Sequence, residues 1–362
     1  FCSNSTATAS LLDPPEPIIN LLNRSTTTHT TFRFIQEDIL QPGVLLAIQD
    51  FALVEIIDGY VNLLVGQVNV NIWPSEPFGY ATSFVQLRHN TSQILLADHD
   101  HGCIRLIERE SWSVSTYSGT CSKDEQEPTD GDIHSARFGA PYDLAFANGH
   151  TNDVLLTDKL YIRKIDTLNK SVTTVYQQFV DPEQHFWVFQ RLLVTNQGQV
   201  YATRYKAGLH VFSAEWRLER VSRPRFNADA VLDVLRGHYR IPAAVESFES
   251  IAMLTDDLFL ISLPSRYGLG SMAVLNLKDD SITLLCPGIV NSEVQANTTR
   301  GVLIGACERS NIYDLLIVNH TLLTAGSPST YRDNRFYNLS GVDAYKINGM
   351  YNFVVNAERY SD

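Results

Sequence analysis

The residues best suited to chemistry lie together in the segment Asp98-His99-Asp100-His101. In an extended strand, alternate side chains point the same way, so His99 and His101 would share one face and could hold a metal ion with the neighbouring carboxylates. A zinc site needs a third fixed ligand, and the turns that follow similar apolar segments elsewhere in the chain supply no histidine. Those turns carry Asp158-Lys159, Arg204 and Glu308. We therefore expect no metal or other cofactor, and interpret the segment as a polar turn in which Asp98 bonds to the local backbone.

Motifs for nucleophilic catalysis are missing from the sequence. It contains no G-x-S-x-G motif, and its adjacent acid pairs, such as Asp256-Asp257 and Asp279-Asp280, are typical of hairpin turns. We expect that the protein is not an enzyme.

The composition indicates a large globular protein. Of 362 residues, 44% are hydrophobic and 19% are charged, which is ample for a packed core and argues against disorder. The net charge of −12 disfavours a nucleic-acid partner, because phosphate binding needs an excess of Lys and Arg. The most apolar window, residues 44–66, contains three acidic residues and does not fit a membrane-spanning helix.

Several features predict a secreted glycoprotein. The sequence begins at Phe1 without a Met, as expected after removal of a secretory signal. Seven N-x-S/T sequons, most of them at expected turns or strand ends, are candidate glycosylation sites. Their asparagines are Asn4, Asn23, Asn90, Asn169, Asn297, Asn319 and Asn338.

Five cysteines also fit an oxidising compartment. Cys103 lies in one expected strand and Cys121 ends the next, so a hairpin would bring them together. Cys286 closes one repeat, and Cys307 lies early in the following one. We predict the disulfides Cys103–Cys121 and Cys286–Cys307, with buried free thiols as the alternative. Cys2 is left over as a candidate for pairing between chains.

The elements that must position these residues repeat along the chain. Apolar strand segments recur at intervals of 44 to 60 residues, and each except the last is followed by one or two further short apolar runs. Their anchors are Val44, Leu95, Leu155, Val200, Leu258, Val302 and Phe353. Short strands at this spacing are typical of four-stranded blades. We predict an all-β protein with a single β-propeller of seven blades, or of six if one anchor is misassigned.

The two ends of the chain are expected to share the last blade. Residues 17–25 and 29–36 are strand-like runs without an anchor, and pairing them with the C-terminal strands would close the ring. The propeller then covers residues 17–362 and follows an N-terminal arm, residues 1–16. A loop insertion at 223–248 contains a segment, 227–237, with the cap, apolar spacing and final glycine of a short helix.

Residues 94–176 resemble NHL repeats. The likeness consists of an Ala-Asp pair after an apolar strand, an Ile-Arg-x-Ile strand and an Asp-Gly…Ala-Arg-Phe loop. These elements are Ala97-Asp98, Ile104-Arg105-x-Ile107, Asp130-Gly131, Ala136-Arg137-Phe138 and Ile162-Arg163-Lys164-Ile165. Other blades keep only the strand pattern, and Ala202-Thr203-Arg204 departs from the Ala-Asp element. The resemblance implies an NHL-type propeller; the signatures of WD40 and kelch propellers are missing.

In such a propeller, the loops after the second and fourth strands of each blade open on one funnel-shaped face. Loops that differ between repeats on such a face are a natural place for binding. The candidate ligand-binding residues are Asp98, His99, Asp100, His101, Asp158, Lys159, Arg204, Lys206, Arg266, Tyr267, Glu308 and Arg309.

These features together predict a secreted, non-catalytic module that binds a protein or glycan partner. One alternative is a structural subunit of an extracellular fibre, matrix or coat, in which the N-terminal arm and Cys2 join copies of the chain. A second is a metal-dependent lyase or hydrolase. The NHL resemblance suggests it, because one NHL-type lyase releases amidated peptides with zinc held by histidines of several blades, a set not found in this sequence.

Overall fold

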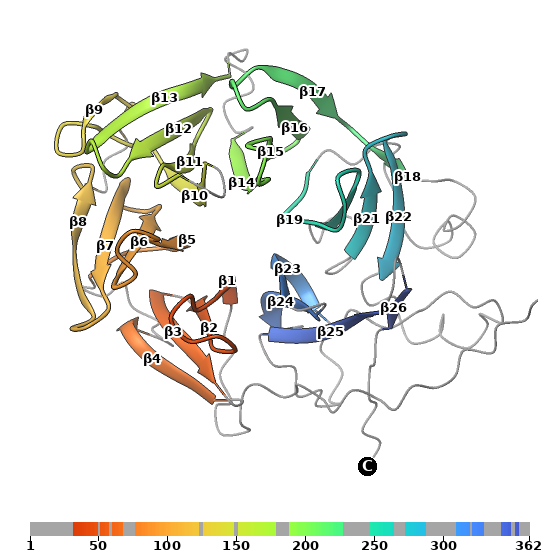
Figure 1. Cartoon of the computed structure of the whole chain (residues 1–362), viewed down its shortest axis with the longest axis horizontal. Coiled ribbons are helices and arrows are strands. Elements are labelled where there is room, and N and C mark those ends of the chain that lie inside the picture. The colour runs from red at the N-terminus through yellow and green to blue at the C-terminus, as the bar shows by residue number, and fades with distance from the viewer. Residues whose placement is uncertain are drawn as a thin grey trace, which may run out of the picture.

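The computed structural model describes thirteen segments of the chain. They are residues 32–49, 51–57, 60–67, 77–122, 126–147, 151–178, 188–226, 247–263, 272–286, 309–318, 321–328, 342–348 and 352–354. Every regular element within these segments is a β-strand, and the strands form six sheets around a central axis (Figure 1). This arrangement is a β-propeller. No helix in the described segments is long and apolar enough to cross a membrane.

The first three sheets follow one another along the chain. Sheet 1 contains β1 (Phe32–Glu37), β2 (Leu45–Gln49), β3 (Phe51–Ile57) and β4 (Tyr60–Gln67). Sheet 2 contains β5 (Ala81–Gln86), β6 (Gln93–Asp98), β7 (Cys103–Glu108) and β8 (Ser113–Ser118). Sheet 3 contains β10 (Pro141–Phe146), β11 (Val154–Asp158), β12 (Tyr161–Asp166) and β13 (Ser171–Gln177), with β9 (Gly131–Asp132) added at its outer edge.

The other three sheets complete the ring. Sheet 4 contains β14 (Phe189–Val194), β15 (Val200–Arg204), β16 (Gly208–Phe212) and β17 (Leu218–Ser222). Sheet 5 contains β19 (Ser250–Met253), β20 (Leu258–Ser262), β21 (Met272–Asn276) and β22 (Ser281–Cys286), with β18 (Arg225–Phe226) parallel to β22. Sheet 6 contains β23 (Arg309–Val318), β24 (Thr321–Pro328), β25 (Val342–Asn348) and β26 (Asn352–Val354).

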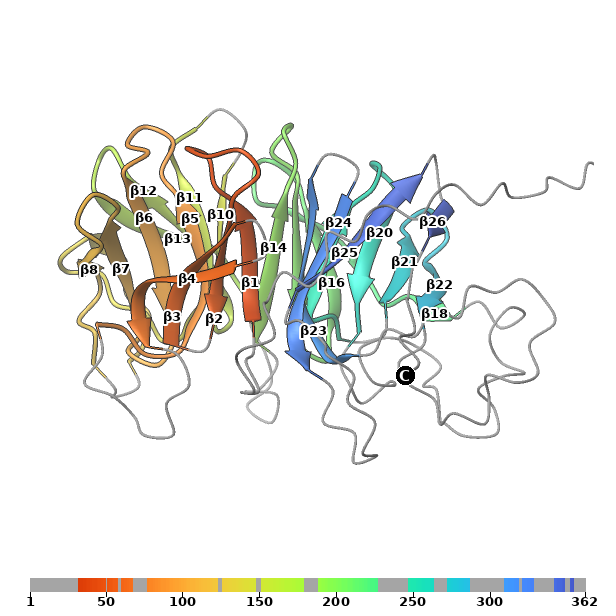
Figure 2. The same ribbon diagram turned by 90° about the horizontal axis from the view of Figure 1, so that it is seen from below.

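Apart from the short strands β9 and β18, which lie at outer edges, each sheet places its first strand nearest the axis and its later strands progressively outward (Figure 1). The strands run between two loop-bearing faces, as the side view shows (Figure 2). We call the face with the β6–β7 and β11–β12 turns the upper face. The opposite, lower face carries the turns that join first to second strands and third to fourth strands.

The hydrophobic core lies between neighbouring sheets. One cluster joins sheets 2 and 3 through Leu95, Ile104, Leu144 and Leu156, and comparable clusters join sheets 1 and 2, 3 and 4, 4 and 5, and 6 and 1. Second strands such as β11 are buried along their whole length, because other strands flank them and other sheets cover both faces. Their continuous apolar runs follow from this two-sided burial, and explain why these strands could be identified from the sequence.

The prediction of seven blades is wrong, since the described residues form six sheets. The anchors on sheets 1 to 5 mark second strands, as expected. In the last sheet the second strand is β24, however, and Phe353 lies in the outermost strand, β26. Val302 lies outside the described residues. Phe353 therefore belongs to the sixth sheet and does not start a seventh.

The predicted sharing of one blade by both chain ends is also wrong for the described strands. The run at 29–36 supplies β1, the innermost strand of sheet 1, because a tight turn closed by the Asp38 N to Val44 O hydrogen bond (2.8 Å) returns the chain directly to β2. Sheets 1 and 6 are separate neighbours, joined where the Ile35 amide donates to Asp314 (3.0 Å). Residues 1–31, Cys307 and the expected helix at 227–237 lie outside the described residues.

The predicted disulfide Cys103–Cys121 is confirmed, with a Cα–Cα distance of 4.9 Å. It joins the start of β7 to the loop that follows β8. The connection from β8 to β10, interrupted by β9, also contains the Ala136–Phe138 segment, which fills the junction of sheets 2 and 3 with the fully buried Phe138. The disulfide thus ties down the start of the connection that packs between two sheets.

Replacing both cysteines with alanine should lower the free energy of unfolding by about 3 kcal/mol, because the bond closes a loop of 18 residues. Urea denaturation of the wild-type protein and of the Cys103→Ala/Cys121→Ala variant measures the difference. Reductant should destabilise the wild-type protein by more than it destabilises the variant. Equal stability of the two oxidised proteins would contradict the expectation.

Candidate functional site

Bulges near the start of the innermost strands turn side chains toward the axis. The pairing register shifts between Ala81 and Phe84 in β5, between Pro141 and Leu144 in β10, and between Phe189 and Leu192 in β14. A bulge re-aims the side chains of the residues that leave the ladder. β1 and β23 carry similar shifts.

Threonines on second strands satisfy the backbone amides that two bulges release. The Thr157 hydroxyl of β11 accepts from the Asp143 amide at 3.0 Å, and the Thr203 hydroxyl of β15 accepts from the Arg191 amide at 2.9 Å. Buried amides without a partner would be costly, so these threonines allow the bulges to persist inside the protein.

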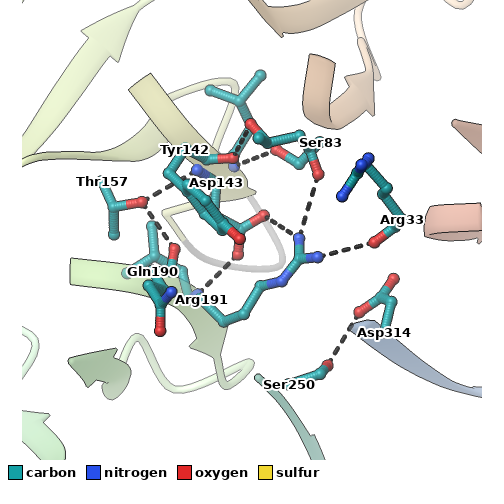
Figure 3. Close-up of polar contacts among 12 residues, drawn as sticks. Arg33, Ser83, Tyr142, Asp143, Thr157, Gln190, Arg191, Ser250 and Asp314 are labelled. Carbon is teal, nitrogen blue, oxygen red and sulfur yellow. Dashed lines mark hydrogen bonds and ion pairs between the residues drawn. The ribbon is translucent and has the colours of Figure 1, made fainter. Parts of the chain in front are cut away.

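One residue from each innermost strand forms a ring around the axis, which we call the axial ring. Its members are Phe34, Ser83, Asp143, Arg191, Ser250 and Asp314. At four junctions a ring side chain accepts a hydrogen bond from a backbone amide of the next sheet. These bonds are Leu144 N to Ser83 Oγ (2.7 Å), Leu192 N to Asp143 Oδ2 (2.7 Å), Leu315 N to Ser250 Oγ (3.2 Å) and Ile35 N to Asp314 Oδ2 (3.0 Å). Figure 3 shows Ser83, Asp143, Arg191, Ser250 and Asp314 of this ring, with Ser250 bonded to Asp314. The axial ring therefore joins the innermost strands side by side.

Arg191 closes the axis at the level of this ring. Its guanidinium leaves sheet 4 and reaches four other sheets: one terminal nitrogen donates to Thr82 O (3.3 Å) and Asp143 Oδ1 (3.4 Å), and the other to Arg33 O (2.8 Å) and Tyr313 O (3.0 Å). The side chain is almost fully buried. Arg191 is thus the common partner of sheets 1, 2, 3, 4 and 6.

Burial and opposite charges set the protonation of the axial ring. Burial raises the pKa of Asp314 to about 6, with Arg191 opposing the shift, and burial likewise raises the pKa of Asp143. Burial alone would lower the pKa of Arg191, but Asp314 and Asp143 reverse this effect and raise it. Arg191 therefore stays charged, while Asp314 changes its protonation in mildly acidic solution.

This assignment predicts a pH dependence of stability. Because the pKa of Asp314 is about 6 in the folded protein and about 3.9 in an unfolded chain, the folded state holds the proton more tightly. Its contribution to stability is therefore full below about pH 4 and is lost as the pH rises through about 6. Asp314→Asn should flatten this part of the curve, so the difference in unfolding free energy between wild type and variant should change by roughly 1–3 kcal/mol from pH 4 to 7. If the unfolding free energies of the two proteins change with pH in parallel, the expectation is wrong.

A second layer of side chains lies one residue before the axial ring in each innermost strand. This upper axial layer consists of Arg33, Thr82, Tyr142, Gln190, Glu249 and Tyr313. Thr82 is buried and its hydroxyl donates to the Tyr142 carbonyl, whereas the other five side chains are partly exposed. An accessible group of aromatic, charged and amide side chains thus lies next to a closed, buried ring.

Tyr80 and His99 extend the upper axial layer toward sheet 2. Arg33 donates to the Tyr80 hydroxyl at 2.6 Å, and its guanidinium lies 4.2 Å from the centre of the Tyr80 ring. The His99 ring makes edge contacts with Tyr80 and Tyr142, with ring centres 5.8 and 5.9 Å apart. Burial raises the pKa of both tyrosines, so their hydroxyls remain protonated donors at neutral pH.

The two histidines of the Asp98–His101 segment do not share a face. The segment forms a turn in which Gly102 adopts φ +57°, so the alternation of an extended strand does not apply. His101 Nδ1 contacts the Asp98 carboxylate at 2.9 Å, while His99 faces the tyrosines. Within the described residues, no group of three or more His, Cys, Asp or Glu could hold a metal ion. Of this segment, His99 reaches the upper axial layer.

Asp98 and Asp158 occupy equivalent buried positions at the ends of β6 and β11. Asp98 accepts from the Gly79 amide and from Arg105 Nε (3.1 and 2.9 Å). Asp158 accepts from the Gly139 and Ala140 amides (2.9 and 2.7 Å) and from Arg163 (3.2 Å). Contrary to the prediction for these two residues, their carboxylates stabilise the sheets and present no surface to a partner. Burial raises the pKa of Asp158.

The other predicted ligand-binding residues are spread over the upper face. Arg204 is buried, with its guanidinium 5.7 Å from the centre of the Phe189 ring, and so is also part of the fold. Lys206 is exposed, Lys159 is partly exposed, and Asp100 accepts from the Tyr80 amide at 3.2 Å. Arg309 begins β23, and Arg266, Tyr267 and Glu308 lie outside the described residues. The described members do not form one cluster with the upper axial layer.

Two sequon asparagines can be placed, both in turns of the lower face. Asn90 lies in the β5–β6 turn, and the exposed Asn169 lies in the β12–β13 turn. The other five, Asn4, Asn23, Asn297, Asn319 and Asn338, lie outside the described residues. Glycans at Asn90 and Asn169 would project away from the upper axial layer.

The sequence carries one signal for the axial residues. The tripeptide Tyr-Asp-Leu occurs at 142–144 and again at 313–315, in each case within an innermost strand. A polar residue inside an otherwise apolar strand indicates either a bulge or a functional position. The repeat would have pointed to Asp143 and Asp314, but not to Arg191.

Comparison with known proteins supports the fold alone. No protein-family model matches the sequence, and no curated protein matches it. The structure is similar to the extracellular domain of a protein described as a hybrid two-component system from B. thetaiotaomicron, with a TM-score of 0.51 and 12% identity over 88% of this chain. This chain spans 40% of the length of that domain. A protein described as a candidate gluconolactonase gives a TM-score of 0.51 and 9% identity, covering 85% of this chain and 92% of that one. At these identities the likeness shows a β-propeller.

Proposed function

We propose that this chain is a secreted, glycosylated β-propeller of the NHL type that binds a protein or glycan partner and performs no catalysis of its own. The observation that carries the proposal is the upper axial layer. Five partly exposed polar and aromatic side chains meet there beside a ring that closes the axis. Tyr and Arg are the residues most enriched at the energetic centres of binding surfaces.

The NHL assignment is supported by the roles of the residues that suggested it. The Asp and Ile-Arg elements form the buried Asp98–Arg105 and Asp158–Arg163 pairs in consecutive sheets. The same two elements thus produce the same contact twice, as expected of a structural repeat.

Secretion and glycosylation are supported by the disulfide and the placed sequons. Cys103 and Cys121 are bonded, which suits an oxidising compartment. Asn90 and Asn169 lie in turns of the lower face, where glycans would leave the upper axial layer open. Mass spectrometry before and after removal of N-glycans tests the two sites.

A binding screen with variants of the upper face tests the proposed function. The purified chain is probed against arrays of glycans and extracellular proteins, and the strongest ligand is measured with a His99→Ala/Tyr313→Ala variant. Loss of two central contacts should weaken binding by about 30-fold or more, since such residues typically contribute 2 kcal/mol. The Tyr313 carbonyl that binds Arg191 is retained, so the axial ring should persist.

Leu168→Ala is the matched control, because Leu168 is the most exposed large apolar side chain described, at 65%, and lies on the lower face. It should bind as the wild-type protein does. If the control loses binding and the axial variant retains it, the partner uses the lower face and the assigned site is wrong.

A further inference from the structure

Arg33 is a cation of the upper axial layer that makes no ion pair with any described residue. Among the described residues, the Arg33 side chain donates one hydrogen bond, to the Tyr80 hydroxyl, whereas the ion pairs there belong to other cations. Nε of Arg33 is buried and makes no hydrogen bond. By contrast, Arg191, Arg163, Arg109 and Arg105 all contact carboxylates. A guanidinium left in this state is a ready partner for a carboxylate brought by a ligand.

Two phenol groups beside Arg33 can donate to the same ligand. The Tyr80 hydroxyl accepts from Arg33, so its own hydrogen is free to bond outward. The Tyr142 hydroxyl makes no hydrogen bond in the described part of the chain, and the Tyr142 side chain is partly exposed. Gln190 adds an amide in the same layer. The cation therefore lies beside three neutral groups that suit hydroxyls.

The charges around Arg33 limit the ligand to a single negative charge. Asp100 lies against Tyr80, where it accepts from the backbone amide at 3.2 Å, and Glu249 belongs to the same axial layer. A contact with His99 keeps the pKa of Asp100 low, so this carboxylate is charged at neutral pH. A phosphate or sulfate cluster would meet repulsion from these two acids, whereas one carboxylate can be balanced by Arg33 alone.

We propose that the upper axial layer binds a sugar with one carboxylate, of the hexuronic acid type, with the carboxylate on Arg33 and the ring hydroxyls on Tyr80, Tyr142 and Gln190. This inference rests on the proposed function and names the chemistry of its ligand. Arg33 positions the charge, and the tyrosines and the amide recognise the hydroxyls that surround it.

A pair of sugars that differ only at one carbon gives a direct test. D-glucuronic acid and D-glucose are titrated into the full-length protein, and binding is followed by isothermal titration calorimetry and by ligand-observed NMR. Glucuronate should bind at least tenfold more tightly than glucose, because a charge-assisted bond to a guanidinium corresponds to about 10- to 100-fold in affinity. Added salt should weaken the glucuronate complex alone.

Variants separate the role of Arg33 from general electrostatics. Arg33→Gln should reduce glucuronate affinity to that of glucose, and Tyr80→Phe, which keeps the ring, should reduce it several-fold. The control is Arg88→Gln: the Arg88 guanidinium also stacks on an aromatic ring, Phe146 at 4.0 Å, but lies in the β5–β6 turn of the lower face. It should bind glucuronate as the wild-type protein does. Circular dichroism establishes that each variant is folded.

The outcomes distinguish this inference from the function on which it rests. Equal affinity for glucose and glucuronate, unchanged affinity of Arg33→Gln, or failure of both sugars to bind at tens of millimolar would overturn the inference. So would tighter binding of a peptide carboxylate than of its amide, combined with no binding of glucuronate. In these cases, loss of the screened partner by His99→Ala/Tyr313→Ala would leave the proposed function standing.

Discussion

Replacing Arg191 with methionine should lower the free energy of unfolding by about 3–5 kcal/mol, because it leaves the buried carboxylates of Asp143 and Asp314 without their cation. Four backbone and side-chain acceptors on other sheets would also lose their donor. The innermost strands would then keep only the hydrogen bonds between neighbouring sheets. Urea denaturation followed by tryptophan fluorescence measures the loss.

Arg220→Met is the matched control for this substitution. Arg220 also pairs with an aspartate, Asp280, at 2.6 Å, but both side chains are more than one-third exposed. Water screens this pair, so we expect a loss below about 1 kcal/mol. Asp143→Asn in the Arg191→Met background should recover part of the stability, because it removes one of the unpaired charges. If the two arginine variants lose equal stability, Arg191 is not the centre of the axial ring.

Replacing Arg163 with leucine should cost a similar amount, about 3–5 kcal/mol, for a different reason. Arg163 and Asp158 are both fully buried, and their contact lies within sheet 3. Arg163 also donates to the main-chain carbonyls of Arg137 (2.5 Å) and Thr129 (2.6 Å), and so holds the long loop before β10. In the variant, the loop should no longer be held in place, and Asp158 should lose its charged partner. Hydrogen exchange of residues 126–140 would show faster exchange.

The equivalent residue of sheet 2 provides the comparison. Arg105 pairs with Asp98 as Arg163 pairs with Asp158, but it is 15% exposed and its other hydrogen bond goes to the Thr116 side chain. Asp98 also keeps the Gly79 amide and His101 as partners after the change. Arg105→Leu should therefore cost only about 1–2 kcal/mol. A loss equal to that of Arg163→Leu would show that the Asp–Arg pair, and not the loop, dominates.

Much of the local structure could be predicted from the sequence. The apolar runs that mark second strands are continuous because these strands are buried on both faces, and each of the runs at Leu95, Leu155 and Val200 does form such a strand. The Cys103–Cys121 bond also followed from local spacing, since one strand and its hairpin bring the two residues together. Periodicity and turn chemistry act over a few residues and are visible in the chain itself.

The candidate site was only partly predictable. The Asp98–His101 segment drew attention because of its residue types, and one member, His99, contacts the upper axial layer. Asp98 instead forms a buried pair with Arg105, of a kind that recurs in the next sheet. Residue types alone do not distinguish an aspartate in such a pair from one in a ligand-binding turn. Arg33 and Tyr80 lie alone at the start of a strand or just before it, with nothing in their local sequence to mark them, and the only local sign of Tyr142 is the repeated Tyr-Asp-Leu tripeptide.

The sequence by itself determined that the chain forms repeated four-stranded sheets, because burial pattern and turn residues specify strands locally. Only the tertiary structure decided that the described strands form six sheets around the axis and which residues meet at its centre. Closure depends on contacts such as Ile35 with Asp314, which are 279 residues apart. The members of the axial ring come from six different sheets, and bulges turn them toward one another. No periodicity in the chain encodes such a meeting, because it follows from the curvature that the packed sheets adopt together.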